Sequence, residues 1–433
     1  MKDYLKKTCP CGKMHTVPID DVVVGSGAVK RLPEFVKKYG KKPFIIADVN
    51  TWQAAGEAVS TALGDVPSGR YIFPQQALEP DERAVGAAFM HLDRSSDVLV
   101  GVGSGVVNDV CKIVSNVAKL PYIIVATAPS MDGYASATSS MSMDGVKVSL
   151  NSRCADVIIG DTDILKNAPA HMLSSGLGDM LAKFISIAEW RIAHIITGEY
   201  YCEAVAELIR GAVKKCAENA RGLLQREEKA VEAVFEGLVI GGIAMAYAGV
   251  SRPASGVEHY FSHVWDMRGL EFGTQVDLHG IQCATATLMA ARLYGIVAQL
   301  TPNREKAETY VNQFSYDAWA SQLREFLGSS GDTMIALEAK EGKYRKDTHP
   351  ARFDIIRGNW DSILQILKEE IPPAEELEQL LIIAGIPTDP AAFGIDRQTA
   401  RQTFRATKDI RDKYVLSRLA WDLGILEELC QLI

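Results

Sequence analysis

Residues 97–130 read DVLVGVGSGVVNDVCKIVSNVAKLPYIIVATAPS. Two short apolar runs, Val98–Val102 and Tyr122–Ala126, lie on either side of a helical segment, Val106–Ala118. Each run has the length of a buried strand, and a glycine-rich turn joins the first run to the helix. A strand, a helix and a second strand in this order predict a βαβ unit with parallel strands.

The same alternation extends over the first part of the chain. Further strands are predicted at Asp21–Val24, Phe44–Ala47, Tyr71–Phe73 and Ala155–Ile159, with helices at Gly56–Ala62 and Pro80–Leu92. After about Asp163 only helical patterns remain, at Ile185–Ile196, Tyr200–Gln225, Lys229–Ala248, Gln282–Gln299, Arg304–Leu327, Trp360–Lys368, Ala374–Ala384 and Tyr414–Glu428. Loops are predicted at Gly328–Asp332 and Pro350.

These patterns predict an α/β plus all-α fold, in which a mostly parallel, Rossmann-like domain precedes a helical domain. We expect an N-terminal arm at 1–18, a dinucleotide-binding α/β domain at 19–168, and a helical metal- and substrate-binding domain at 169–433. A length of 433 residues suits two domains. Because ligands of parallel sheets bind beyond the carboxyl ends of the strands, we expect the active site in the cleft between the domains.

Composition excludes some classes of partner. The net charge of −8 argues against a nucleic-acid partner. The apolar stretch Ile281–Leu300 contains Gln282, Arg292 and Gln299, which favours a buried helix over a membrane span. The eight cysteines are scattered and no apolar signal segment is evident at the N-terminus. Both features suit a reducing cytoplasm.

Two loops that follow predicted strands are candidates for cofactor binding. Gly101–Asp109 is a glycine-rich turn that enters a helix, where backbone N–H groups and the helix dipole favour phosphate; a plain tight turn is the alternative. Thr127–Ser136 offers hydroxyls and one carboxylate, Asp132, which suits a substrate hydroxyl better than a phosphate. Asp48 ends an early strand, where an acid can accept ribose hydroxyls and favour NAD, or can cap the helix that follows.

The stretch 251–282, SRPASGVEHYFSHVWDMRGLEFGTQVDLHGIQ, contains three histidines. His259 and His263 are four residues apart and share a helix face, and His279 follows. Together with Asp179, His259 and His279 form a carboxylate and imidazole set that suits a divalent metal with an open position. The alternative is a helix whose histidines only satisfy hydrogen bonds. The motif lacks the glutamate of H-E-x-x-H and therefore the general base of a metalloprotease.

The N-terminal segment CPCGKMH is a separate local feature. Cys9, Cys11 and His15 could hold a structural zinc ion. No fourth ligand is evident nearby in the sequence, and the C-x-C spacing is less specific than C-x-x-C. We therefore favour a plain N-terminal arm over a metal site.

Taken together, these residues resemble the sn-glycerol-1-phosphate dehydrogenase family, in the superfamily of iron-type alcohol dehydrogenases, glycerol dehydrogenase and dehydroquinate synthase. The resemblance runs from about residue 20 to the end and includes TKDIRDKYVLSRLAWDLGIL near the C-terminus. The superfamily pattern G-G-G-S-x-x-D-x-x-K is similar to Gly103–Lys112, where Ser104 replaces the middle glycine and Val106 the serine.

The resemblance implies roles for individual residues. Asp132 and His263 would act on the substrate as catalytic residues, Asp179 would contact it, and Asp179, His259 and His279 would hold the metal. Arg252 is our first choice to clamp a substrate phosphate, with Lys147 and Lys183 as alternatives; each could equally be an ion-pair residue. In addition to Asp48, the residues expected to contact the cofactor are Gly105, Val106, Val107, Asn108, Asp109, Thr127, Ala128, Pro129, Ser130 and Ser136.

The implied activity is interconversion of sn-glycerol 1-phosphate and dihydroxyacetone phosphate, with NAD or NADP and one divalent ion. Zinc, nickel and ferrous iron all suit imidazole and carboxylate ligands. The metal would stabilise the alkoxide that expels hydride to the nicotinamide, and the hydroxyl proton would pass to water or to His263.

Three other functions stay open. They are another polyol or alcohol dehydrogenase of the same superfamily, a sugar-phosphate cyclase resembling dehydroquinate synthase, and a non-catalytic binding protein. The expected partners are a small phosphorylated substrate and, through apolar helices, a second copy of the chain in a homodimer. Neither a nucleic acid nor a membrane span is expected.

Overall fold

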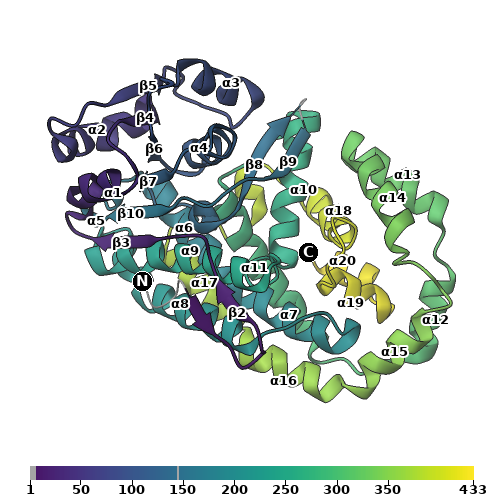
Figure 1. Cartoon of the computed structure of the whole chain (residues 1–433). Helices are drawn as coiled ribbons and strands as arrows, with labels where there is room; N and C mark the ends of the chain where they lie inside the picture. Colours follow the sequence, from purple (N-terminus) through teal and green to yellow (C-terminus); the bar gives the residue numbers. More distant parts are fainter. Residues whose placement is uncertain (1–5, 144–145) are drawn as a thin grey trace. The chain divides into compact units, whose positions relative to one another are not determined.

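A six-stranded parallel sheet forms the centre of the first part of the chain (Figure 1). The strand order is β3-β10-β7-β6-β4-β5, and every neighbouring pair is parallel. The sheet consists of β3 (Asp21–Gly25), β4 (Pro43–Asp48), β5 (Gly69–Phe73), β6 (Val98–Gly103), β7 (Tyr122–Ala126) and β10 (Val157–Asp161). All six strands predicted from the sequence are present, within two residues at each end.

The sheet is parallel because helices connect its strands and cover its apolar residues. Every residue of β4, β6, β7 and β10 is buried, as expected for valine- and isoleucine-rich strands covered on both faces. The connecting elements are η2 (Ala28–Arg31), α1 (Leu32–Tyr39), α2 (Val49–Leu63), α3 (Glu82–His91), α4 (Gly105–Ala118) and η3 (Asp132–Ala135), and α5 (Thr162–Leu165) follows the last strand. The predicted mostly parallel α/β domain is confirmed.

Two small antiparallel hairpins were not predicted from the sequence. They are β1 (Lys6–Thr8) with β2 (Met14–Thr16), and β8 (Thr138–Met143) with β9 (Val146–Asn151). Strands of three residues, or strands rich in serine, give almost no hydrophobic alternation. The structure describes residues 6–143 and 146–433, so residues 1–5 of the predicted arm lie outside it. The described part of that arm is a hairpin.

The chain divides into two compact units, and each contains two segments of sequence. Unit 1 comprises Met1–Met180 and Ala204–Val250, and unit 2 comprises Leu181–Glu203 and Ser251–Ile433. Unit 1 therefore includes the sheet and most of α6 (Ala170–Leu181), α8 (Glu203–Leu223) and α9 (Glu228–Ala248). The single boundary expected after residue 168 stays a prediction, because the compact units follow packing rather than one cut in the sequence.

Unit 2 is helical throughout its described secondary structure, in agreement with the predicted helical region. Its elements are α7 (Lys183–Thr197), α10 (Val257–Phe272), α11 (His279–Val297), α12 (Arg304–Asn312), α13 (Tyr316–Leu327), α14 (Ser329–Glu341), α15 (His349–Gly358), α16 (Trp360–Glu370), α17 (Ala374–Ile383), η4 (Pro390–Phe393), α18 (Arg397–Thr407), α19 (Leu416–Asp422) and α20 (Leu426–Leu432).

Four local predictions in this region were wrong. The helix expected at 304–327 is two helices, because Ser315 caps a new one, and the helix expected at 414–428 breaks at Gly424, whose φ is +71°. The expected loop 328–332 instead begins α14, where Gly331 lets two helices approach: a Cβ there would lie 2.7 Å from the carbonyl oxygen of Leu323. Pro350 lies in the first turn of α15, where proline is tolerated.

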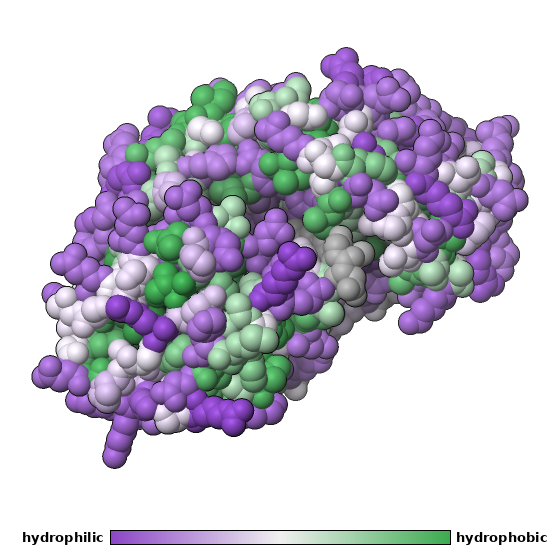
Figure 2. Space-filling model, turned by 90° about the horizontal axis from the view of Figure 1, so that it is seen from above, coloured by the Kyte–Doolittle hydropathy of each residue, from purple (hydrophilic) through white to green (hydrophobic). Residues whose placement is uncertain are grey.

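One described helix, α9, is long and apolar enough to cross a membrane, but 78% of its apolar window is buried within the structure. Such burial is typical of a core helix. The apolar helix singled out from the sequence, α11, is also largely buried. Hydrophilic residues predominate on the face seen in Figure 2, with apolar residues between them.

One close contact in unit 1 fixes the position of α6. A Cβ on Gly176 would lie 1.7 Å from the carbonyl oxygen of Pro129, in the loop that follows β7. The Ser175 hydroxyl donates a hydrogen bond of 2.9 Å to the carbonyl of Ser130 in the same loop. Only glycine permits this approach, so residue 176 sets how closely α6 packs on the loop.

We expect Gly176→Ala to destabilise the protein by about 1–3 kcal/mol or more, because the added methyl group must displace backbone. Urea unfolding followed by circular dichroism measures this change. The matched control is Gly211→Ala on the exposed surface of α8, where a Cβ meets nothing within 4 Å. Its stability should be unchanged or rise by up to about 1 kcal/mol. Equal effects at both positions would contradict this interpretation of residue 176.

Candidate functional site

The residues predicted to bind cofactor gather at one edge of the sheet in unit 1. Strands β4, β6 and β7 are neighbours, and their carboxyl ends carry Asp48, the turn into α4, and the loop Thr127–Ser130. Gly103 pairs with Ala126, and the Thr127 N–H donates to the Gly103 carbonyl at 3.1 Å. The topology thus places the loops together at the edge where parallel sheets bind their ligands.

The glycines of the turn between β6 and α4 pack closely against neighbouring side chains. A Cβ on Gly103 would lie 2.4 Å from the side chain of Val107, and one on Gly101 would lie 2.7 Å from the Tyr122 hydroxyl. The Ser104 side chain does not cap α4. The N–H groups of the first turn, which begins at Gly105, therefore lack a side-chain cap from this residue. Such a helix start fits a pyrophosphate group.

Side chains of α4 hold the loop that carries Asp132. Lys112 is fully buried, and its ammonium donates to the carbonyls of Gly133, at 3.2 Å, and Thr138, at 2.6 Å. It also pairs with Asp109 at 2.8 Å. Asn108 donates to the same Gly133 carbonyl. The motif lysine and asparagine thus act here as structural supports, a role that the sequence did not indicate.

Asp48 is the N-cap of α2, the structural alternative considered for this residue. Its carboxylate accepts from the Thr51 N–H at 2.8 Å, and the Thr51 hydroxyl accepts from the Asp48 N–H at 3.0 Å. This capping box fixes the carboxylate at the sheet edge. Contact with a ribose stays a prediction.

Two acidic residues of unit 1, Asp132 and Asp179, lie close together. The Asp132 N–H donates to a carboxylate oxygen of Asp179 at 2.9 Å. Asp179 is fully buried on α6, the helix positioned by Gly176. Ser136, predicted to contact the cofactor, ends the short helix η3 and lies 2.9 Å from the Thr138 hydroxyl.

The three predicted histidines come together within unit 2. His259 and His263 lie on α10, and His279 begins α11. The ring centroids of His259 and His279 are 5.0 Å apart, and those of His263 and His279 are 5.8 Å apart. Three imidazoles at this separation suit a metal centre and an adjacent proton carrier better than three independent structural histidines.

Neighbouring side chains orient two of these rings. The Nδ1 atom of His259 lies 2.8 Å from the Glu258 carboxylate, and Nδ1 of His279 lies 2.9 Å from the Ser262 hydroxyl. The same Glu258 oxygen accepts from the Gly256 N–H at 2.7 Å. With Nδ1 of each ring engaged, Nε2 is the atom left to ligate a metal. The donor set therefore fits a divalent ion.

The sequence interpretation missed Cys283 at this site. Its Sγ lies 3.5 Å from Nε2 of His279, and Cys283, His259 and His279 can offer ligand atoms within 4.8 Å of one another. Burial raises the pKa of the thiol, but the neighbouring histidines outweigh burial and the net shift is downward. The signal available in the sequence was its position four residues after His279 on a helix.

The structure describes the side chains of two of the three residues predicted to clamp a phosphate. Arg252 is buried and pairs with both carboxylate oxygens of Glu199, at 2.6 and 2.7 Å, and it donates to the Tyr414 carbonyl at 3.0 Å. A phosphate would have to compete with this carboxylate. Lys183 is fully buried at the start of α7. The side chain of Lys147 lies outside the described part of the chain.

Two ionisable side chains, Glu189 and Lys413, are buried in unit 2. Burial, reinforced by the neighbouring Glu258 carboxylate, raises the pKa of Glu189 to about 8. Lys413 donates to the Ser255 carbonyl at 2.7 Å, and burial, with the positive charge of Arg252, lowers its pKa to about 7.

Comparison with known proteins identifies relatives of this chain. The family model for iron-containing alcohol dehydrogenases matches residues 23–169. Glycerol-1-phosphate dehydrogenase (NAD(P)+) of Halalkalibacterium halodurans is 33% identical over 314 residues, covering 71% of this chain and 77% of that protein. The Geobacillus stearothermophilus protein of the same name is 27% identical over 417 residues and covers 94% and 93%.

Solved structures show the same fold. The iron-containing alcohol dehydrogenase of Thermococcus thioreducens has a TM-score of 0.62 at 13% identity, covering 95% of this chain and 98% of that one. Glycerol dehydrogenase of Schizosaccharomyces pombe has a TM-score of 0.57 at 18% identity, covering 95% and 90%.

Glu258 is expected to raise the metal affinity of the histidines by holding the His259 ring in position. Glu258→Gln should weaken binding of zinc or cobalt at the histidines by about 10–100-fold, because the amide no longer holds the His259 ring as a carboxylate does. Competition with a chelating dye measures this affinity. Glu338→Gln is the matched control, since Glu338 is also buried but accepts from the Tyr344 N–H. Equal affinities in the two variants would contradict this role.

The buried Lys413 is expected to make the free energy of unfolding depend on pH. Between its pKa of about 7 in the folded chain and 10.5 in the unfolded chain, the unfolded state binds more protons. The free energy of unfolding should therefore rise with pH across this window, relative to Lys413→Met. Below about pH 7 both states carry the proton, and the cost of burying the charged ammonium is at its full size. Urea unfolding at several pH values tests this.

The matched control for this pH dependence is Lys214→Met. The Lys214 side chain is 78% exposed, so its ammonium is hydrated in both states. A difference between wild type and Lys413→Met that stays constant from pH 7 to pH 10.5 would refute the assignment.

Proposed function

Because the chain belongs to the glycerol-1-phosphate dehydrogenase family, within the iron-containing alcohol dehydrogenases, we propose that it interconverts sn-glycerol 1-phosphate and dihydroxyacetone phosphate with NAD or NADP. The observation that carries the proposal is the 33% identity to a named relative over 77% of that protein. The sheet edge in unit 1 and the histidines in unit 2 supply matching chemistry.

The proposed metal ligands are Asp179, His259 and His279, with zinc, nickel or ferrous iron as the ion. A bound divalent ion would supply Lewis-acid polarisation of the substrate oxygen, and the nicotinamide would exchange the hydride. Glu258 and Ser262 support this assignment, because they engage Nδ1 of the two histidines and leave Nε2 for ligation.

Cofactor binding is assigned to the sheet edge. The first turn of α4, Gly105 to Asp109, would receive the pyrophosphate at its N–H groups. The loop Thr127–Ser130 and Ser136 would add hydroxyls and backbone groups, and Asp48 would accept ribose hydroxyls. The start of α4 supports this, because the Ser104 side chain does not cap its first N–H groups.

Two side chains, His263 and Asp132, are proposed to contact the reacting part of the substrate. His263 would take the hydroxyl proton during oxidation and return it during reduction, since an imidazole titrates near neutral pH. Asp132 would orient a substrate hydroxyl. The hydrogen bond from Asp132 to Asp179 is made by the Asp132 backbone N–H and not by its side chain. A homodimer and a cytoplasmic location are part of the same proposal.

The test is the absorbance of NADH with dihydroxyacetone phosphate, measured before and after chelation and after separate addition of zinc, nickel and ferrous iron. We expect metal-dependent loss of NADH and formation of the sn-1 enantiomer. His259→Ala should lower kcat/KM by more than about 100-fold, because it removes a metal ligand. The matched control, His91→Asn on the exposed face of α3, should be unchanged.

Other outcomes would identify other functions. Turnover of free glycerol with none of the phosphate ester would indicate a different polyol dehydrogenase. Release of inorganic phosphate from a sugar phosphate without net change in NADH would indicate a cyclase. A purified chain that binds neither metal nor cofactor would indicate a non-catalytic protein.

A further inference from the structure

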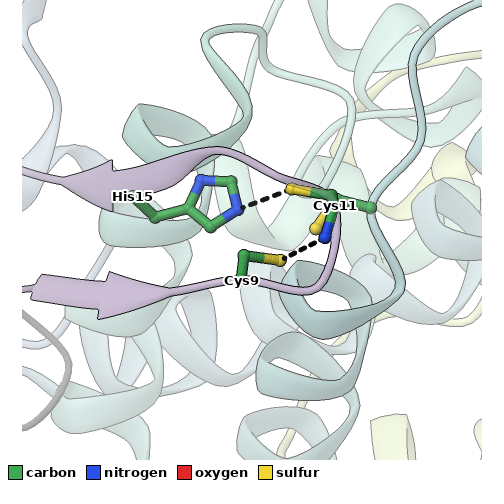
Figure 3. Close-up of side chains that lie close together, drawn as sticks. Cys9, Cys11 and His15 are labelled. Carbon is green, nitrogen blue, oxygen red and sulfur yellow. Dashed lines mark hydrogen bonds between the residues drawn. The ribbon is translucent and has the colours of Figure 1, made fainter.

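The N-terminal hairpin brings together two thiols and an imidazole outside the proposed active site. Cys9 follows β1, Cys11 lies in the turn, and His15 is the central residue of β2 (Figure 3). The Sγ atom of Cys11 lies 3.4 Å from Nε2 of His15. The N–H of Cys11 donates to Sγ of Cys9 at 3.5 Å. All three residues offer ligand atoms within 4.8 Å of one another.

The backbone of the hairpin produces this convergence. Pairing of Lys7 with His15 places the imidazole beside the start of the turn. The Gly12 N–H donates to the Cys9 carbonyl at 3.1 Å, and Gly12 has a φ of +81°, which closes the chain sharply after Cys11. The turn thus carries both sulfurs back toward the ring.

His15 is held in the tautomer that a metal ligand requires. Its Nδ1 lies 3.0 Å from the carbonyl oxygen of Tyr247 at the end of α9, and its ring stacks on that of Tyr247 at 5.0 Å. A carbonyl can only accept, so Nδ1 carries the proton and Nε2 presents its lone pair to Cys11. A backbone carbonyl on the other ring nitrogen is the usual outer support of a metal-bound histidine.

We propose that Cys9, Cys11 and His15 bind a zinc ion, distinct from the ion of the proposed active site, with a donor from outside the hairpin or a water completing the coordination. Zinc prefers thiolate and imidazole ligands in a tetrahedral arrangement. Zn–S bonds of about 2.3 Å and Zn–N bonds of about 2.0 Å place neighbouring sulfur and nitrogen atoms about 3.5 Å apart. The separation of 3.4 Å between Cys11 and His15 matches this edge.

The role of this ion is to fix the N-terminal hairpin on unit 1. Strands of three residues are too short to be stable alone. On binding, both thiols lose their protons to solvent, and the N–H of Cys11 stabilises the Cys9 thiolate. Through His15 and Tyr247, the closed hairpin is then tied to α9.

Cobalt substitution of the full-length protein tests the site, because sulfur ligands give a near-ultraviolet charge-transfer band that nitrogen and oxygen ligands do not. We expect two cobalt ions per wild-type chain and the sulfur band. Cys11→Ser should bind one ion and lose the band. Cys11 is exposed, so this variant should fold, and retention of the second ion checks that it has.

Two control variants locate the source of the band. Cys216→Ser, at a buried cysteine whose thiol donates to the Ala233 carbonyl, should keep both ions and the band. Cys283→Ser should also keep the band, which excludes the thiol beside His279. Loss of the band in Cys283→Ser but not in Cys11→Ser would overturn the proposal. So would the absence of the sulfur band from a wild-type chain that binds one ion, or a Cys9–Cys11 disulfide in place of bound metal. One ion that gives the band and is lost in Cys11→Ser would support the hairpin site and count against the metal of the proposed active site.

Discussion

The contact between Gly176 and the carbonyl of Pro129 is the constraint on which the arrangement of unit 1 depends. Because residue 176 has no side chain, α6 packs directly on the loop after β7. That packing places Asp179 where it accepts from the Asp132 N–H, and Ser175 binds the same loop. A strand end, a loop and a helix are thereby held as one piece, which is what a pre-organised binding site requires.

The two proposed metal sites of this chain share one kind of support, a protein group that engages Nδ1 of a histidine. At the histidines of unit 2, Glu258 and Ser262 engage Nδ1, so Nε2 is the nitrogen proposed to ligate the metal. At the N-terminal hairpin, the carbonyl of Tyr247 engages Nδ1 of His15. At His259 and His15 the partner of Nδ1 is a carboxylate or a carbonyl, which accepts a hydrogen bond and so holds the proton on Nδ1. The chemical difference lies in the other donors, a carboxylate in the proposed active site and thiols in the hairpin.

Much of the fold was predictable because its strands are strongly apolar. Runs such as Tyr122–Ala126 indicate buried strands, because they are short and apolar and prolines lie near both ends, at 121 and 129. The β8–β9 hairpin was missed because its strand Thr138–Met143 is mostly serine and methionine, with weak alternation. The start of α14 was missed because glycine normally marks a loop, whereas Gly331 serves close packing of two helices.

The sequence alone determined the residue types of the site and its family resemblance, since the H-x-x-x-H spacing and the glycine turn are local features. It also indicated the parallel sheet, because the spacing of apolar residues within each strand and helix is a local feature of the sequence. Only the tertiary structure decided how these residues are used. Lys112 and Asn108 became supports for a loop, Arg252 became the partner of Glu199, and Cys283 joined the histidines. These outcomes depend on contacts between residues far apart in the chain, and no local pattern encodes which donor meets which acceptor.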